Sequence, residues 1–138
     1  YMSNRNRLPG GSRLIPIPSV SDERGVLAFA TGGVEIPFPV ARVFWIYDVP
    51  ETQHRGGHAH RTCAEVVFAV RGSFTMCVDD GTSRSEVCLS EPTEGILIPA
   101  GVWCELKDFE PGTVLVVLAS HSYDAEGYIN DYEEYRKQ

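Results

Sequence analysis

The sequence lacks the features that mark several large classes of protein. It contains no run of about 18 apolar residues, so no membrane-spanning helix is predicted. The first residues carry basic side chains without the apolar stretch of a secretory signal peptide. The four cysteines form no Cys-x-x-Cys pair, which, together with the missing signal, predicts reduced thiols. We therefore expect a cytoplasmic protein with no membrane partner.

Positive charge is also scarce. The chain has 12 lysines and arginines against 19 aspartates and glutamates, a formal net charge of −7. The basic residues form no stripe of the kind that nucleic-acid binding requires, so we expect no nucleic-acid partner. An anionic ligand would have to be held by a few locally placed arginines against the overall negative field.

Helical periodicity is confined to the end of the chain. Elsewhere, 13 glycines and 9 prolines are spread among short β-prone runs, a pattern that predicts an all-β sandwich or barrel. The length of 138 residues suits one domain, which we expect over 13–138 after a flexible arm at 1–12. The tail at 125–137 is predicted to be a short helix, because aromatic and apolar residues recur there at spacings of three and four.

The β-prone runs are separated by turn signals. Turns are predicted at 22–25 (Asp-Glu-Arg-Gly) and 79–81 (Asp-Asp-Gly). The most apolar run, at 41–49, is predicted to be a strand buried on both faces, with Phe44 and Trp45 in the core. Strands are predicted over 13–18, 26–30, 41–49, 65–70, 73–78, 85–89, 95–99, 102–106 and 113–119.

The most informative motif is the segment Arg-Gly-Gly-His-Ala-His at 55–60. Residues i and i+2 of a strand point to the same side, so His58 and His60 are expected to enter one pocket. Glu65 follows five residues later and Gly72 seven after that, a spacing that resembles the first cupin motif. The second cupin motif, Pro-x-Gly-x-x-His, is also matched, but Cys104 stands in place of its last histidine. This resemblance implies a cupin, or double-stranded β-helix jelly-roll, fold.

These residues leave two chemical interpretations open. His58, His60, Glu65 and Cys104 have the donor atoms to bind zinc or iron. The alternative is that the two histidines are acid–base groups and Glu65 is an ordinary strand residue. Because the last histidine ligand of the motif is replaced, we expect no metal at this site.

A second resemblance is more specific and extends over residues 22–135. The chain resembles the WxcM-like sugar-nucleotide 3,4-ketoisomerases in the order and spacing of its motifs. The resemblance implies a metal-free homodimer that needs no cofactor and acts on dTDP-4-keto-6-deoxyglucose. It also implies a role in deoxyamino-sugar biosynthesis for lipopolysaccharide or S-layer glycans. The matching stretches include 22–25, 36–38, 42–48, 55–60, 72–74, 79–81, 102–105, 118–120 and 123–129.

The implied reaction fits the residues. A 3,4-ketoisomerase removes the proton at carbon 3, next to the ketone at carbon 4, and returns a proton at carbon 4 through an enediol, which gives a dTDP-3-keto-6-deoxyhexose. Removing and returning these protons needs groups whose pKa lies near neutrality, and histidine is such a group. The resemblance assigns this role to His58 and His60. Which of the two removes the proton, and whether the product is the galacto or gluco form, stays open.

Substrate binding is expected to depend on arginine and on Cys104. Arg55, Arg24 and Arg42 are candidates for holding the diphosphate or the developing enolate. Arg55 and Arg24 lie in glycine-containing motifs, whereas Arg42 opens a strand and could instead sit at the rim. Our hypothesis is that Cys104 and Arg24 influence the face on which carbon 4 is protonated.

Three other functions share this fold. A 3,5-epimerase of nucleotide sugars is disfavoured, because that class lacks the His-x-His pair. A non-catalytic cupin that binds a small ligand, and a metal-dependent cupin enzyme, remain as alternatives. Members of the ketoisomerase family often have tyrosine in the run where this chain has Phe44 and Trp45, which leaves open any step that depends on a hydroxyl there.

Overall fold

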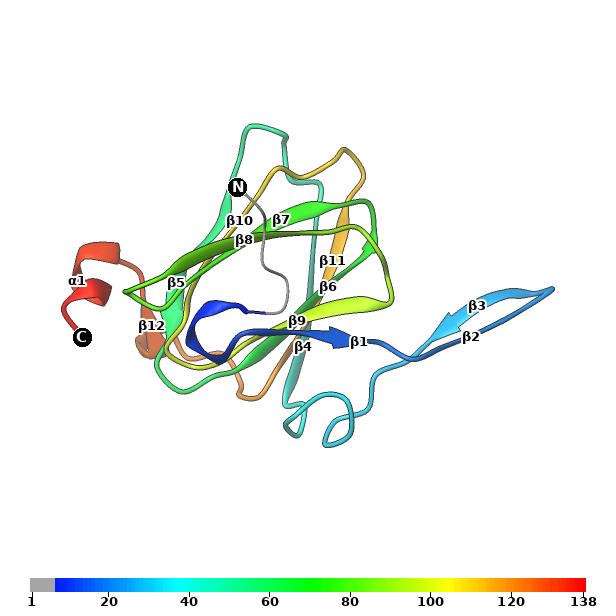
Figure 1. The fold of residues 1–138 in the computed structure, drawn as a ribbon, viewed down its shortest axis with the longest axis horizontal. Helices are drawn as coiled ribbons and strands as arrows, with labels where there is room; N and C mark the ends of the chain where they lie inside the picture. Colours follow the sequence, from blue (N-terminus) through cyan, green and yellow to red (C-terminus); the bar gives the residue numbers. More distant parts are fainter. Residues whose placement is uncertain (1–6) are drawn as a thin grey trace.

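The computed structural model describes residues 7–138. It consists of two five-stranded antiparallel sheets that face each other, and a two-stranded hairpin that projects from the body (Figure 1). One sheet has the order β1 (Arg13–Pro16), β9 (Glu94–Ile98), β6 (Glu65–Arg71), β11 (Val114–Ala119) and β4 (Arg42–Tyr47). The other has the order β12 (Tyr128–Ile129), β5 (Arg55–His60), β10 (Trp103–Lys107), β7 (Phe74–Asp79) and β8 (Arg84–Leu89). The hairpin is β2 (Ser19–Asp22) with β3 (Gly25–Ala28).

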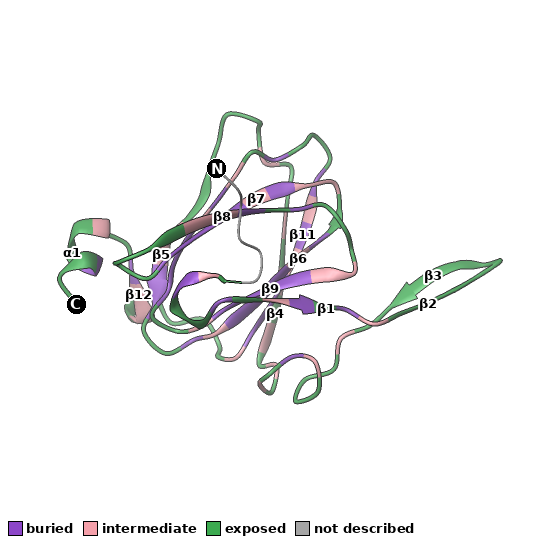
Figure 2. Ribbon diagram, viewed as in Figure 1, coloured by how far each residue is buried: buried purple, intermediate pink, exposed green. Residues whose placement is uncertain are grey.

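The core lies between the two sheets. On β7, Phe74, Met76 and Val78 are fully buried, as the alternation of the strand predicts. They pack with Ile96 of β9 and Leu115 of β11 from the facing sheet. Figure 2 shows these strands buried along much of their length. The predicted all-β cupin jelly roll is confirmed. No helix within residues 7–138 is long and apolar enough to cross a membrane.

The prediction that the strand at 41–49 is buried on both faces is wrong. Strand β4 is the last strand of its sheet, and its outward residues Val43, Trp45 and Tyr47 are 50%, 62% and 58% exposed. Phe44 and Ile46 point inward and pack against the core. Apolar residues occupy both faces of this strand, but only one face packs against other residues among 7–138.

The C-terminal tail is also less helical than predicted. It contains a 3-10 turn, η2 (Ala125–Gly127), then the short strand β12, and only then the helix α1 (Tyr132–Arg136). The backbone at 128–129 pairs with β5 instead of continuing a helix. Asp131 begins α1 by accepting hydrogen bonds from the backbone amides of Glu133 and Glu134.

The predicted arm at 1–12 is only partly described. Residues 1–6 lie outside the described residues. A 3-10 turn, η1 (Pro9–Gly11), follows, and Pro9 and Ser12 are buried. The turn predicted at 22–25 joins β2 to β3, although a strand at 19–22 was not expected from the sequence. Figure 2 shows that the hairpin is exposed throughout.

The turn between β6 and β7 requires glycine at position 72. Gly72 has a φ of +78°, and a Cβ placed there would lie 2.3 Å from the Oγ1 atom of Thr113. We predict that Gly72→Ala lowers the free energy of unfolding by about 3 kcal/mol or more. Gly33→Ala is the control, because Gly33 has a φ of +80° with open space around it, so that only the backbone cost of about 1–2 kcal/mol applies. Urea denaturation measures both; equal losses would contradict the proposed clash with Thr113.

Candidate active site

A cavity of about 360 Å³ opens between the two sheets. Strand β4 contributes Phe44 and Ile46 to its wall, and β6 contributes Glu65 from the same sheet. The remaining polar lining comes from the facing sheet and the tail. It includes Arg55 and His58 of β5, Cys104 of β10, Tyr128 of β12, and Tyr123 and Asn130.

A bulge in β5 sets the position of His58. In the pairing of β5 with β10, Cys104 lies opposite His58 and Glu105 lies opposite Gly56, so Gly57 is an extra residue without a counterpart. Gly56 and Gly57 both have a φ of +76°, a region that strongly favours glycine. The two glycines of the motif therefore allow the strand to bend directly before its histidines, and they leave His58 beside Cys104.

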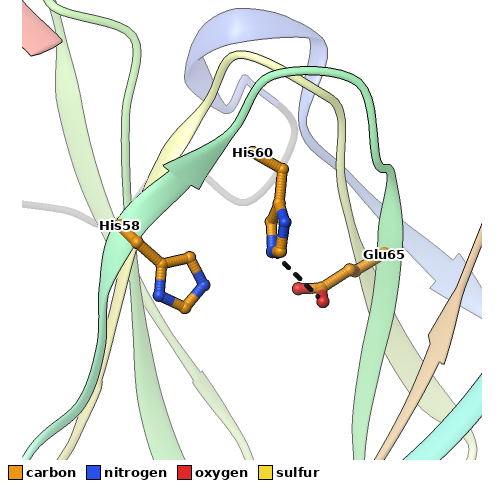
Figure 3. Close-up of side chains that lie close together, drawn as sticks. All are labelled: His58, His60 and Glu65. Carbon is orange, nitrogen blue, oxygen red and sulfur yellow. Dashed lines mark ion pairs between the residues drawn. The ribbon is translucent and has the colours of Figure 1, made fainter. Parts of the chain in front are cut away.

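His58, His60 and Glu65 gather in the interior (Figure 3). The rings of the two histidines are 4.9 Å apart between centroids and nearly perpendicular. The Oε2 atom of Glu65 lies 3.3 Å from Nε2 of His60, and these two residues are 5% and 4% exposed. This approach is within ion-pair range but lacks hydrogen-bond geometry, so Nε2 of His60 has no hydrogen-bond partner among residues 7–138. Glu65 is therefore a neighbour that can orient His60. From the sequence alone, Glu65 was equally well a metal ligand or an ordinary strand residue.

Burial lowers the pKa of His58 below its ordinary value of 6.5. The charge of a protonated His60 lowers this pKa further, while Glu65 and a hydrogen bond with the Gly56 backbone act in the opposite direction. His58 is therefore neutral at pH 7, the form in which an imidazole can accept a proton.

The two histidines border different cavities. His58 lines the main cavity, whereas His60 lines a smaller one of about 130 Å³ together with Cys63 and His121. The two imidazoles are brought together as the spacing predicts, and the carboxylate of Glu65 that faces His60 lines the main cavity together with His58. Tyr128 borders both cavities. Sequence reasoning placed Tyr128 on a helix and missed it; the available signal was its place in the matching stretch 123–129.

The predicted substrate-binding residues are not all brought together. Arg55 and Cys104 line the main cavity. Arg42 lines the smaller one, with its guanidinium 5.0 Å from the centroid of the Phe44 ring and its Nε atom buried without a partner in the described chain. Arg24 lies in the turn of the β2–β3 hairpin, on the side of the molecule away from β5 (Figure 1). Its side chain is 85% exposed and pairs with Asp22 at 2.7 Å, so within one chain Arg24 is outside both cavities.

The site offers an incomplete set of metal ligands. Donor atoms of His58, His60 and Glu65 lie within 4.8 Å of one another, which is close enough for one divalent cation. Cys104 stands where cupins supply a further ligand, but burial raises the pKa of its thiol. The neutral thiol is a poor ligand compared with a thiolate. Three residues therefore fit a metal and the fourth does not.

Two facing sheets with an imidazole–carboxylate cluster between them define a cupin-type domain. The chain belongs to the WxcM-like family, since the family model described as "FdtA: WxcM-like, C-terminal" matches residues 10–138. A relative from Aneurinibacillus thermoaerophilus, a TDP-4-oxo-6-deoxy-alpha-D-glucose-3,4-oxoisomerase, is 34% identical over 126 residues, which are 91% of each chain. The resemblance inferred from the motifs is thereby confirmed.

Solved structures agree with this assignment. A 3,4-ketoisomerase from Helicobacter canadensis has a TM-score of 0.90 and 32% identity, covering 92% of this chain and 96% of that one. A histidine-to-asparagine mutant of QdtA from Thermoanaerobacterium thermosaccharolyticum, in complex with TDP-4-keto-6-deoxyglucose, has a TM-score of 0.91 and 32% identity, covering 94% of each chain. The RmlC epimerase of Mycobacterium tuberculosis, at 20% identity and a TM-score of 0.76 over 92% of this chain and 72% of that one, shares the fold.

The position of His58 makes a testable prediction about pH. If neutral His58 removes a proton, kcat/KM falls only as the pH drops below 6.5, because the pKa of His58 is lowered. His58→Asn and His60→Asn should each reduce kcat/KM by about 100-fold or more, and the residual activity of His58→Asn should lack this acid limb. His54→Asn is the matched control, since His54 is exposed and outside both cavities. An acid limb centred above pH 6.5 would contradict the role of His58.

Proposed function

We propose that this protein is a sugar-nucleotide 3,4-ketoisomerase that converts dTDP-4-keto-6-deoxyglucose into a dTDP-3-keto-6-deoxyhexose. One observation carries the proposal. A neutral imidazole, that of His58, lines a cavity between the sheets, next to the buried pair of His60 and Glu65. Relatives of the same length and fold are 3,4-ketoisomerases, which supports the same reaction here.

The geometry suggests how the proton moves. His58 accepts the proton from carbon 3, and the electrons of that C–H bond form the double bond of an enediol as the ketone oxygen takes a proton from the second acid–base group. The acid–base pair then delivers a proton to carbon 4 and accepts the proton of the carbon-3 hydroxyl, so that its oxygen becomes the new ketone and both groups regain their starting protonation. We assign removal to His58 because it faces the larger cavity. His60, oriented by Glu65, is the second acid–base group.

The surrounding residues suit an anionic substrate. Arg55 lines the main cavity and is placed to stabilise the developing enolate or to hold the diphosphate. Cys104 lies opposite His58 as a neutral thiol, so it shapes the space beside the reacting carbons.

The four cysteines are free, which supports the cytoplasmic location expected from the sequence.

The reaction itself needs no metal, because the ketone acidifies the neighbouring C–H bond. Incubation with dTDP-4-keto-6-deoxyglucose should give a 3-keto product that NMR identifies, and protein treated with a strong chelator should retain full activity. The stereochemistry at carbon 4 is read from the same spectra. Loss of activity on chelation, restored by zinc, iron or manganese, would contradict the metal-free mechanism. Absence of any product would contradict the function.

A second candidate function is a small-ligand cupin that binds a metal or acts without catalysis. The clustering of donor atoms from His58, His60 and Glu65 favours this alternative. Metal analysis of the purified protein tests whether it is a metal-binding cupin. A non-catalytic cupin would bind dTDP-4-keto-6-deoxyglucose without exchange of its carbon-3 proton into deuterated water.

We further propose that two copies form a homodimer. The hairpin carries exposed apolar side chains, including Val26 at 67% and Leu27 at 63%, and a two-stranded hairpin is only marginally stable on its own. Strand β4 has an edge that no described strand pairs with and an exposed apolar face with Trp45 at its centre, and unpaired edges bind readily to another chain. A two-fold dimer in which each hairpin lies against β4 of the other copy covers both surfaces.

This arrangement gives Arg24 a role. Strand β4 forms one wall of the main cavity through Phe44 and Ile46. A hairpin lying along β4 brings its turn, with Arg24, towards the cavity of the other copy. The residue that is remote from the histidines within one chain is thus supplied to the substrate by the second chain.

Mixing two inactive variants tests this dimer. Arg24→Ala and His58→Asn should each have little activity. After subunit exchange, half of the dimers contain one chain of each kind and half of their sites are intact, so about a quarter of the native activity returns. No recovery would contradict sharing of Arg24. Light scattering of the native protein should give a mass of twice 15.3 kDa. Trp45→Glu should reduce this mass, whereas the control Thr82→Glu, in the β7–β8 turn, should leave it unchanged. A monomeric native protein would contradict the dimer.

A further inference from the structure

Tyr128 contacts both histidines through its ring. The centroid of the Tyr128 ring lies 4.9 Å from that of His58 and 4.4 Å from that of His60. The two imidazoles are themselves 4.9 Å apart, so the three rings form a triangle in which each touches the other two. The hydroxyl of Tyr128, in contrast, has no hydrogen bond to the described part of the chain. The contact that Tyr128 makes with the catalytic pair is therefore one of ring against ring.

Backbone pairing and a buried anchor fix this ring. Tyr128 lies directly opposite His60 in the pairing of β12 with β5, and Ile129 lies opposite Ala59. The amide of Arg61 donates a hydrogen bond of 2.8 Å to the carbonyl of Gly127, just before the strand. Ile129 is 5% exposed and packs in a cluster with Ala59. Tyr128 therefore cannot move away from His60 unless these contacts break.

The helix that follows holds the strand from its other end. The hydroxyl of Tyr132 donates a hydrogen bond of 2.6 Å to the carboxylate of Asp79, and the hydroxyl of Tyr135 donates one of 2.7 Å to the carbonyl of Gly101. Both rings also contact Trp103 of β10. Two side chains of a five-residue helix thus connect the tail to strands of the sheet that carries the histidines.

We propose that Tyr128 is a positioning residue, whose ring holds the imidazoles of His58 and His60 in their catalytic orientation and excludes water from the space beside them. This inference rests on the proposed function for its catalytic meaning. Glu65 approaches His60 alone, at 3.3 Å. Tyr128 is in ring contact with both members of the pair, and it borders both the cavity of His58 and that of His60.

Removal of the ring has a consequence that can be measured on His58. The titratable and charged groups that face His58 are His60 and Arg55 from β5, Glu65 from β6, Cys104 from β10 and Tyr128 from β12. Of the influences on the pKa of His58, burial is the largest, and it lowers the pKa. Loss of the Tyr128 ring admits water beside His58, so its pKa moves up towards 6.5 while the charged neighbours stay in place.

Three variants separate the ring from the hydroxyl and from general opening of the cavity. Tyr128→Phe retains the ring, and Tyr128→Leu removes it while keeping an apolar side chain. Tyr123→Leu is the matched control, because Tyr123 lines the same main cavity and contacts the Tyr128 ring without contacting either imidazole. NMR titration of the ring protons of His58 reports on its environment whether or not the protein is active, and thermal unfolding reports on the fold.

Tyr128→Leu should raise the pKa of His58 and lower kcat by about tenfold or more, with a smaller change in KM. Tyr128→Phe should leave the titration of His58 unchanged and kcat within about twofold. The proposal is overturned if the two variants lose the same activity, since the hydroxyl would then be responsible, or if Tyr128→Leu leaves the titration of His58 unchanged. It is equally overturned if Tyr123→Leu raises the pKa of His58 by as much as Tyr128→Leu does. If the native protein shows no isomerase activity while the titration shifts appear as expected, the proposed function fails and the positioning of the rings stands.

Discussion

The pairing of β5 on both of its edges is the constraint on which the site depends. Strand β10 lies along one edge and places Cys104 opposite His58, and β12 lies along the other and places Tyr128 opposite His60. A register shift of one residue along either edge would turn the side chains to the opposite face. The imidazoles are therefore held by main-chain hydrogen bonds of the sheet as well as by their side-chain contacts.

The same arrangement determines the electrostatics. The chain carries a net charge of −7, and its proposed substrate is an anion. The positive groups near the histidines are few and are held in place: Arg55 at the main cavity, and Arg42 against the rings of Phe44 and Tyr123. Burial keeps His58 neutral in this setting, so the cavity combines a base with local positive charge in a protein that is negative overall.

The sequence predicted the parts of the site that follow from local periodicity. The proximity of His58 and His60 follows from their spacing in a strand, and the place of Cys104 follows from a motif of fixed length. Tyr128 could not be found in this way, because residues 128, 129, 132 and 135 fit a helical spacing that tertiary pairing with β5 overrides. The exposure of Trp45 could not be predicted either, since the hydrophobicity of a strand does not reveal whether it lies at the end of a sheet.

The extra residue in β5 has a consequence for how such a site can change. Arg55 and His58 both line the main cavity although they are three positions apart, and residues an odd number apart point to opposite faces of a regular strand. Gly57 reverses this parity, because it occupies a position that has no counterpart on β10. A deletion of that single glycine would leave the cavity with either the guanidinium or the imidazole. The presence of both a cation and a base in one cavity thus depends on the count of residues in the strand, and not only on their identity.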